Sequence, residues 1–399
     1  MQRPLPALLR GPLLCGLLLC RMAASQATLT VDATGTGGAF TTVQAAITAA
    51  SPGDRIRVLG TGPYPSFLVD RAVDIEGAGG TRVPGIEVTA VPAGQSARIA
   101  GFALDLPSNA SIFVHHCPGS VLLQNLTISG TIQPLAVVTN PGLHVLAADC
   151  VFTRDCTFFG RSGPTGSPAV LLDAGRLTIT GGVAIGGATI NQAPVPNVGL
   201  PGVVVQNGGQ LHMVSADSLG GIWSSLPANS CDGGDGIRVI QGLVYAIDDC
   251  GLRGRIGIGS GTSGAAVRGS VRYTSDCVIN GAVVGGTQIE ARPRLLSSAQ
   301  VTIGTTLTVT IDGAPLQFLL VGVDLQCLHL PFPLLDGVLA LTPTAALSGA
   351  ILLDLNGVGT LRLPIPGVQT AANQNLFLQG VALGTTGHLL TGPTVVRTQ

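Results

Sequence analysis

The sequence predicts an all-β protein built mainly from short strands that stack directly on one another, as in a parallel β-helix. The strongest observation is a six-residue phrase (small-or-polar, apolar, any, apolar, any, Gly) whose closing glycines are 24 to 34 residues apart. Each copy alternates in polarity, which is typical of a strand with one buried face. The copies follow one another too closely for crossover helices, so we expect about eight coils. The copies are Ala72–Gly77, Ser96–Gly101, Asn125–Gly130, Asp155–Gly160, Gly182–Gly187, Asp249–Gly254 and Asp276–Gly281, with a copy one residue short at Asp217–Gly221.

The composition agrees with this fold and excludes several classes of function. The chain has 399 residues, of which 57 are glycine and 4% are aromatic, as expected for a β-protein rich in turns. Charged residues make up 10% and the net charge is −1, which argues against binding to nucleic acid or to anionic membrane surfaces. All 20 basic residues are arginines, so Schiff-base chemistry, lysine general bases and P-loop lysines are excluded.

Residues 1–27 have the features of a signal peptide. Arg3 and Arg10 give a positive start, and Leu13–Leu19 is an apolar run too short to cross a bilayer. Small residues at Ser25 and Ala27 fit a cleavage site, so we expect cleavage after Ala27. The mature chain is therefore expected to be secreted, or held at the cell surface or in the periplasm, without a membrane span.

Residues 28–64 are predicted to cap the N-terminal end of the β-helix, because an open end of a solenoid would expose its core. Thr41–Ala50 carries Val43, Ala46 and Ile47 on one helical face, and Arg55–Leu59 alternates as a strand.

Residues 65–290 hold the predicted coils, and a separate domain is predicted after them. The two longest gaps between copies hold the insertions Asn191–Pro201 and Leu226–Gly236, and such insertions often shape a binding surface. After a linker at 291–298, residues 299–399 contain about seven or eight strand-like segments, which fit a small β-sandwich. These segments include Val301–Ile311, Leu316–Leu325, Gly337–Leu341, Gly349–Leu353, Thr360–Leu363, Asn375–Leu383 and Thr394–Thr398.

The segment Val31–Gly79 resembles the start of pectinesterases and related proteins of the pectin-lyase-like β-helix superfamily. The resemblance rests on a Gly-rich turn, the helix start Phe40–Gln44, the stop Ser51–Asp54 and the motif Gly62-x-Tyr64, in this order. It implies a right-handed parallel β-helix. The QDTL-, DFIFG- and LGRPW-like segments of pectinesterases are absent, as are the GHG- and RIK-like segments of polygalacturonases. The resemblance therefore transfers no catalytic residue.

Four aspartates hold the first position of the repeated phrase and are candidates for chemistry. They are Asp155, Asp217, Asp249 and Asp276, and the last three are expected on successive coils. Their carboxylates could then lie about 5–10 Å apart, where they could bind a cation or act as an acid and base on a glycoside. The alternative is a polar coil corner, because Asn125 holds the same position and short polar side chains bond to turn backbone.

Two further groups of residues are candidates for ligands. Asp232 and Asp235 lie in a Gly-rich segment that could form a calcium turn, although a flexible loop is the alternative. Trp223, Tyr245 and Tyr273 could stack on a sugar ring, Trp223 best because it lies in an insertion.

Histidine and cysteine give weaker signals. His115 and His116 are expected to face opposite sides of a strand, and His144 is isolated in the sequence. Cys250 and Cys277 hold the same position in adjacent coils, with Cα atoms about 5 Å apart. That distance permits a disulfide, although parallel Cβ vectors give it poor geometry.

These observations lead to two hypotheses of function. The first is an exported, non-catalytic β-helix protein that presents a surface for binding, with carbohydrate as the expected ligand, or for cell-surface assembly. The region after Glu290 looks like a C-terminal domain of large exported bacterial proteins, which agrees with this hypothesis. The alternative is a polysaccharide lyase or glycoside hydrolase that acts on uronate-type polysaccharide through Asp217, Asp249 and Asp276. No cofactor is required by either, and calcium is possible in the second.

Overall fold

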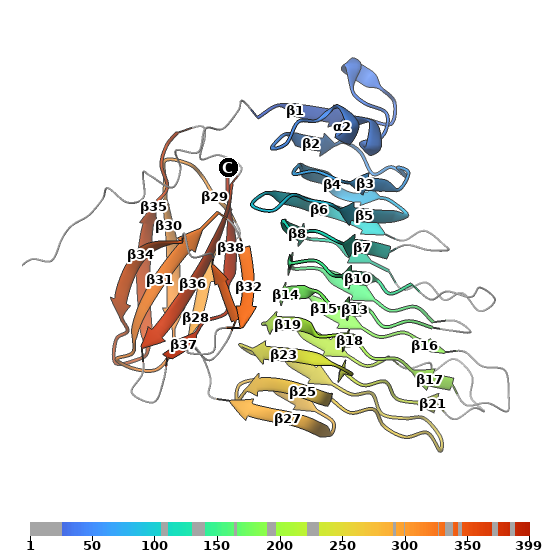
Figure 1. Cartoon of the computed structure of the whole chain (residues 1–399), viewed down its shortest axis with the longest axis vertical. Coiled ribbons are helices and arrows are strands. Elements are labelled where there is room, and N and C mark those ends of the chain that lie inside the picture. The colour runs from blue at the N-terminus through green and yellow to red at the C-terminus, as the bar shows by residue number, and fades with distance from the viewer. Residues whose placement is uncertain are drawn as a thin grey trace, which may run out of the picture. The chain divides into compact units, whose positions relative to one another are not determined.

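The computed structural model describes residues 26–104, 111–129, 140–162, 166–189, 197–221, 231–289, 293–298, 300–325, 327–331, 338–341, 345–368, 374–383 and 388–399. The described part is nearly all β, and it divides into two compact units (Figure 1). The larger unit is Gln26–Arg292 together with Gln326–Ala340, and the smaller one is Pro293–Leu325 together with Leu341–Gln399.

The larger unit contains a sheet of 24 strands, and the pairings between its described strands are parallel. The strands form three ladders. The first ladder joins β1 (Thr28–Val31), β2 (Arg55–Val58), β4 (Asp74–Arg82), β6 (Ser96–Leu104), β8 (Ser120–Gln124), β11 (Cys150–Arg154), β14 (Arg176–Thr180), β19 (Gly209–Val214), β23 (Gly242–Ile247), β25 (Val267–Thr274) and β27 (Val283–Ile289).

The second ladder runs from the end of β6 through β9 (Thr127–Ile128), β12 (Thr157–Phe159), β15 (Val183–Ile185), β20 (Asp217–Leu219), β24 (Gly251–Arg253) and β26 (Val278–Asn280). The third ladder joins β3 (Phe67–Val69), β5 (Gly85–Thr89), β7 (Ser111–His115), β10 (Leu143–Leu146), β13 (Val170–Asp173), β18 (Val203–Gln206), β22 (Ile237–Val239) and the first residues of β25 and β27. From β8 to β24 the chain visits the first, second and third ladder in turn. This arrangement is compatible with a parallel β-helix.

Columns of aliphatic side chains along the ladders form the core of the larger unit. In a parallel sheet equivalent residues of successive strands lie directly above one another, about 4.8 Å apart, so like side chains stack. In the third ladder one such column is buried from β5 to β25. It consists of Ile86, Ile112, Leu143, Val170, Val203, Ile237 and Val267.

The helix expected near the N-terminus of the larger unit is present as α2 (Val43–Ala49), after a short 3₁₀ turn η1 (Thr36–Gly38). The hydroxyl of Thr42 caps the helix by accepting a hydrogen bond from the backbone N–H of Ala45 at 3.2 Å. The apolar face of α2 is buried against β1, β2 and β3, as its 3.6-residue periodicity predicts.

The repeated phrase does not keep one register, and this corrects the expected alignment. The copies that begin at Asn125, Asp155, Asp249 and Asp276 are equivalent in the second ladder. The first two copies, however, belong to β4 and β6 of the first ladder. In the remaining coils the equivalent first positions are Gly181 and Ser215, so the expected copies there are shifted by one and two residues.

The insertions in the two longest gaps contribute a small second sheet to the larger unit. Its strands are β16 (Ala188–Thr189), β17 (Asn197–Gly199) and β21 (Cys231–Asp232). A two-stranded sheet of β32 (Cys327–Pro331) and β33 (Val338–Leu341) also involves residues of this unit.

The smaller unit contains two sheets around one hydrophobic cluster that includes Leu307, Leu319 and Val396. Arg294–Ser297 lies in the segment expected to be a linker but forms β28, because Leu295 is buried while its neighbours are less so. The first sheet holds β28, β30 (Thr306–Asp312) and β35 (Val358–Pro364). The second holds β29 (Gln300–Val301), β31 (Phe318–Asp324), β34 (Ala346–Leu352), β36 (Asn375–Leu383), β37 (His388–Leu390) and β38 (Thr394–Thr398).

Across the residues that the structure describes, we find no helix with the length and apolar character needed to cross a membrane.

Candidate functional site

The aspartates expected to form one acidic column do not share one position. Asp217 pairs with Gly251 in the second ladder, two residues beyond the position held by Asp249 and Asp276. The expected alignment of Asp217 with the other two is therefore wrong. Asp249 is exposed and has φ 58°, in the left-handed region, as do Asn125 and Asp155 at equivalent corners. Short polar residues tolerate this conformation best, so a corner role explains their presence.

Two of the aspartates also fill space beside glycines of the next coil. A Cβ atom at Gly251 would lie 2.1 Å from Oδ1 of Asp217, and one at Gly181 would lie 2.5 Å from Oδ1 of Asp155. These carboxylates therefore pack directly over backbone. The geometry favours a structural role for Asp155 and Asp217 over an acid and base pair.

The two calcium candidates are occupied by hydrogen bonds within the protein. Oδ1 of Asp232 accepts bonds from the backbone N–H and the hydroxyl of Thr262, at 2.6 and 2.9 Å. Asp235 is buried and accepts bonds from Arg238 (2.7 Å), Arg268 (3.0 Å) and the N–H of Ala265 (2.8 Å). A carboxylate between two guanidinium groups is a poor cation ligand. Among the described residues, no group of three or more His, Cys, Asp or Glu side chains is placed to hold a metal ion.

The expected sugar-stacking residues are packed in other ways. Tyr245 is buried, with its ring edge-on to His212 and the guanidinium of Arg272 at 5.8 Å from its centroid. Tyr273 packs against the hydrophobic core of the larger unit. The buried ring of Tyr245 is not available to stack on a sugar, which corrects the expectation for that residue, whereas Tyr273 is only partly buried. Trp223 lies outside the described residues.

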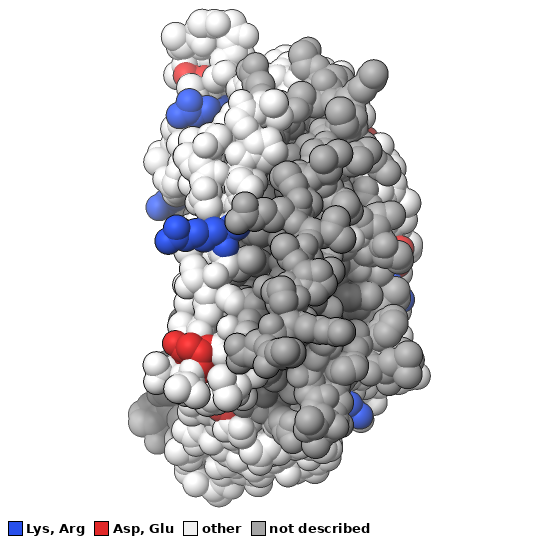
Figure 2. Space-filling model, turned by 90° about the vertical axis from the view of Figure 1, so that its left-hand side faces the viewer, with Lys and Arg blue, Asp and Glu red and all other residues white. Residues whose placement is uncertain are grey.

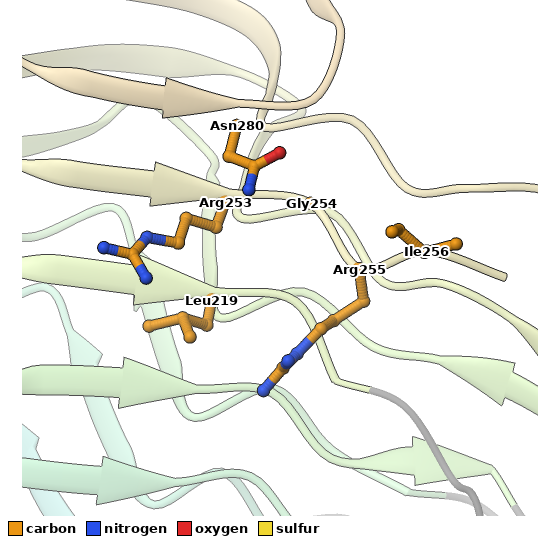
Figure 3. A pocket seen from close by; sticks show the side chains of 6 residues that line it. All are labelled: Leu219, Arg253, Gly254, Arg255, Ile256 and Asn280. Atoms are coloured by element: carbon orange, nitrogen blue, oxygen red, sulfur yellow. The ribbon is translucent and has the colours of Figure 1, made fainter.

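A hollow of about 330 Å³ lies on the outer side of the second ladder, near its last strands. Leu219, Arg253 and Asn280 occupy equivalent positions on β20, β24 and β26, and Figure 3 shows them on successive strands. The side chain of Arg255 runs beside them, and its Nε–H donates to the carbonyl of Gly220 at 3.2 Å. The hollow thus combines two cationic groups, one amide and apolar surface.

The charge at this hollow is not neutralised within the described part of the larger unit. Arg253, Arg255 and Asn280 are exposed, and no described carboxylate forms an ion pair with either arginine. Charged groups are scarce elsewhere, and the face in Figure 2 shows blue and red atoms only in small separate groups. The guanidinium groups of Arg253 and Arg255 extend in different directions (Figure 3), and each offers N–H donors to a carboxylate or another oxyanion in this hollow.

Sequence reasoning missed this hollow, although a signal was available. Arg253 and Asn280 both hold the fifth place of the repeated phrase, so their phrases alone place them on adjacent coils. Arg255 follows Arg253 by two residues, just beyond the end of β24.

A second cluster of side chains on the third ladder brings together His115, His116 and His144. Nε2 of His115 lies 2.8 Å from Oε1 of Glu87, and its Nδ1 lies 3.0 Å from Nδ1 of His116. The expectation that His115 and His116 face opposite sides is wrong, because His116 has φ 49° and turns the chain at a corner. Phe113 stacks with His115 at 4.4 Å and with His144 at 4.9 Å between ring centroids.

The electrostatics of this second cluster follow from its surroundings. Burial lowers the pKa of His144, Asp173 acts to raise it, and His115 acts to lower it. Glu87 and Phe113 also line a hollow of about 420 Å³ at β3, β5 and β7. Of the cluster, Glu87 and Phe113 therefore reach this hollow, and the hydrogen bond from His115 to Glu87 links the imidazoles to it.

Comparisons with known proteins add little to this description. No protein-family profile matches the chain, and no curated protein matches it. One solved structure with a partial likeness is a superoxide reductase (neelaredoxin) from Ignicoccus hospitalis, at 9% sequence identity and a TM-score of 0.18. The match covers 27% of this chain and 80% of that chain. A likeness at this level supports no statement about fold or function.

Proposed function

We propose that this chain is an exported, non-catalytic protein that binds acidic carbohydrate on the surface of a right-handed parallel β-helix. In this proposal residues 1–27 are a signal peptide, residues 28–64 cap a β-helix of the pectin-lyase-like kind, and the C-terminal unit is a β-sandwich. The protein acts outside the cytoplasm, where such polysaccharides occur, and uses the hollow around Arg253 as its binding site.

The observation that carries the proposal is the pair of exposed guanidinium groups in the hollow at β20, β24 and β26. A guanidinium binds a carboxylate through two parallel hydrogen bonds, and the side-chain amide of Asn280 can both donate to and accept from sugar hydroxyls. Leu219 and Ile256 supply apolar surface in the same hollow. A uronate residue offers carboxylate, hydroxyl and C–H groups that match these three features.

The fold supports the proposal by analogy. Three parallel ladders visited in turn expose long flat faces on which equivalent positions repeat about every 4.8 Å. A polymer with repeating units can lie along such a face.

Replacement of Arg253 and Arg255 together by alanine is expected to weaken binding to polygalacturonate or alginate by about tenfold or more. The measurement is isothermal titration calorimetry at two salt concentrations, since binding through guanidinium groups should weaken as salt rises. The neutral polymer dextran is expected to bind poorly to the unmodified protein.

Arg57→Ala is the matched control, because Arg57 is also exposed but lies on β2 of the first ladder, whereas the hollow lies on the last strands of the second ladder. It should leave the affinity unchanged. If the double variant binds acidic polymers as well as the parent does, the hollow is not the binding site.

A second candidate function is polysaccharide cleavage, and the specific observation that favours it is the hydrogen-bonded chain Glu87, His115 and His116. When Nε2–H of His115 donates to Glu87, its Nδ1 accepts from Nδ1–H of His116, and Nε2 of His116 is left as a base. An imidazole whose free nitrogen is oriented by such a hydrogen bond can act as a general base.

Cleavage is tested by incubating the mature chain with pectins, alginates and other uronates, with and without calcium. Unsaturated product or new reducing ends would establish an enzyme. His116→Ala should then reduce the rate at least a hundredfold, whereas a loss confined to Asp249→Ala would assign the activity to the aspartates instead. If no product forms under any condition, the binding proposal is retained.

A further inference from the structure

Two free cysteines face each other on the last strands of the second ladder. Cys250 immediately precedes β24 and Cys277 immediately precedes β26, and Gly251 pairs with Val278 in the parallel register. The two cysteines are therefore equivalent residues of adjacent strands. The Cys250 thiol donates to the carbonyl of Ile247 at 3.0 Å, and the Cys277 thiol donates to the carbonyl of Ala246 at 3.3 Å. Neighbouring Cα atoms in such a pair lie about 4.8 Å apart, within the range of about 4.4–6.8 Å found in disulfides.

The two thiols differ in chemical character. Interaction with the neighbouring Cys250 thiol lowers the pKa of Cys277 to about 7, and the contact with the hydroxyl of Thr274 acts in the same direction. Burial raises the pKa of Cys250 well above its ordinary value. Cys277 is only half-buried, whereas Cys250 is fully buried. Cys277 is thus the thiol that can attack an external disulfide, and Cys250 is placed to resolve the product.

A disulfide between the two cysteines would lie at the end of the parallel sheet, where it would hold the last strands. In the described structure β26 pairs only with β24, and β27 pairs only with β25. Val278 is 55% exposed and Val284 is 47% exposed, so these strands leave apolar surface open to solvent. A terminal coil with one neighbour has the lowest local stability of a repeat array. A covalent bond here would hold the coil that frays first.

We propose that Cys250 and Cys277 form a reversible disulfide that fastens the terminal strands β26 and β27 to the rest of the β-sheet. This inference does not rest on the proposed function. The parallel Cβ vectors require a small adjustment of the strands, and a terminal strand with one neighbour can make it.

The reaction needs a disulfide as oxidant, such as oxidised glutathione. The Cys277 thiolate attacks one sulfur of the oxidant, which forms a mixed disulfide and releases one glutathione thiolate. Cys250 then loses its proton and attacks the Cys277 sulfur, and the second glutathione thiolate leaves. Overall, two protein thiols are oxidised by two electrons and one external disulfide is reduced to two thiols.

The bond can be detected directly on the unmodified full chain. Trypsin cuts after Arg238, Arg253 and Arg272, and the bond before Pro293 resists it, so Cys250 falls in peptide 239–253 and Cys277 in peptide 273–294. Each peptide contains one cysteine. In buffers of oxidised glutathione we expect a single linked species, two hydrogens lighter than the sum of the two peptides, which dithiothreitol separates.

Hydrogen exchange supplies a second readout. Oxidation is expected to slow amide exchange in β26 and β27 by about tenfold or more. Cys250→Ser should abolish this slowing, whereas Cys156→Ser, at the equivalent buried position of an earlier coil, should retain it. Peptides that stay separate at every glutathione ratio, or a Cys277 linked to another cysteine, would overturn the proposal.

Discussion

Replacement of Gly187 by alanine is expected to destabilise the larger unit by about 3 kcal/mol or more. A Cβ atom at this position would lie 1.9 Å from the carbonyl oxygen of Arg161 and 2.4 Å from its carbonyl carbon. These are backbone atoms of the preceding coil, so they cannot move without separating two coils. The measurement is the free energy of unfolding from urea denaturation followed by circular dichroism.

Gly79→Ala is the control for this experiment. Gly79 lies in β4, has no positive φ, and has no atom within 4 Å of a built Cβ. Alanine there should change stability by less than about 0.5 kcal/mol. Equal stabilities of the two variants would show that the coils do not approach each other as closely as the structure indicates.

Asp235→Asn is expected to destabilise the larger unit by about 2 kcal/mol. Asp235 is buried and bonds to Arg238 in its own segment and to Arg268 and the N–H of Ala265 in the next coil, so it ties two adjacent coils together. The expected loss of stability is no larger than this because both arginine side chains are nearly half-exposed and solvent screens their charges. Thermal unfolding at pH 7 measures the effect.

The lowered pKa of Asp235 also determines the direction in which the stability of the larger unit changes with pH. Burial acts to raise the pKa of Asp235, but the bonds from Arg268, Ala265 and Arg238 outweigh it and lower the pKa below the ordinary value. The carboxylate therefore stabilises the fold above about pH 4, and this contribution is lost as the pH falls through the lowered folded-state pKa. The parent should lose stability in acid more steeply than Asp235→Asn does.

Asp232→Asn is the matched control, because the side chain of Asp232 accepts its hydrogen bonds from Thr262 through one oxygen, and asparagine keeps that acceptor. It should cost less than about 1 kcal/mol and leave the acid dependence unchanged. If Asp235→Asn also costs less than about 1 kcal/mol and leaves the acid dependence unchanged, the bonds from Arg238 and Arg268 to Asp235 do not stabilise the larger unit.

The strand pattern of the larger unit was predictable because equivalent positions of parallel strands hold the same kind of side chain. The register was harder to predict where a polar residue faces inward. Ser218 occupies an inward position beside Ala184 and Leu252, and its hydroxyl donates to the carbonyl of Gly236 at 2.8 Å. Because this buried residue is polar, the alternation of apolar and polar residues is not visible here in the sequence. The repeated phrase is therefore expected from the sequence to begin at Asp217, whereas in the structure its first position is Ser215.

The candidate sites were less predictable because they depend on corners and on neighbouring coils. His115 and His116 come together only because His116 adopts a left-handed conformation, which no alternation pattern reveals. Tyr245 is a candidate for sugar stacking in the sequence but is buried against His212 and Arg272. The Arg253 hollow was predictable in principle, since its register follows from the repeated phrase.

A crystal structure of the full mature chain is the most direct test of the parallel stacking on which the sites depend. The account predicts that Thr157, Val183, Asp217, Gly251 and Val278 form one column, with successive Cα atoms about 4.8 Å apart and all strands running in the same direction. Antiparallel hairpins in place of β12, β15, β20, β24 and β26 would contradict it, because Arg253 and Asn280 would then no longer share one hollow.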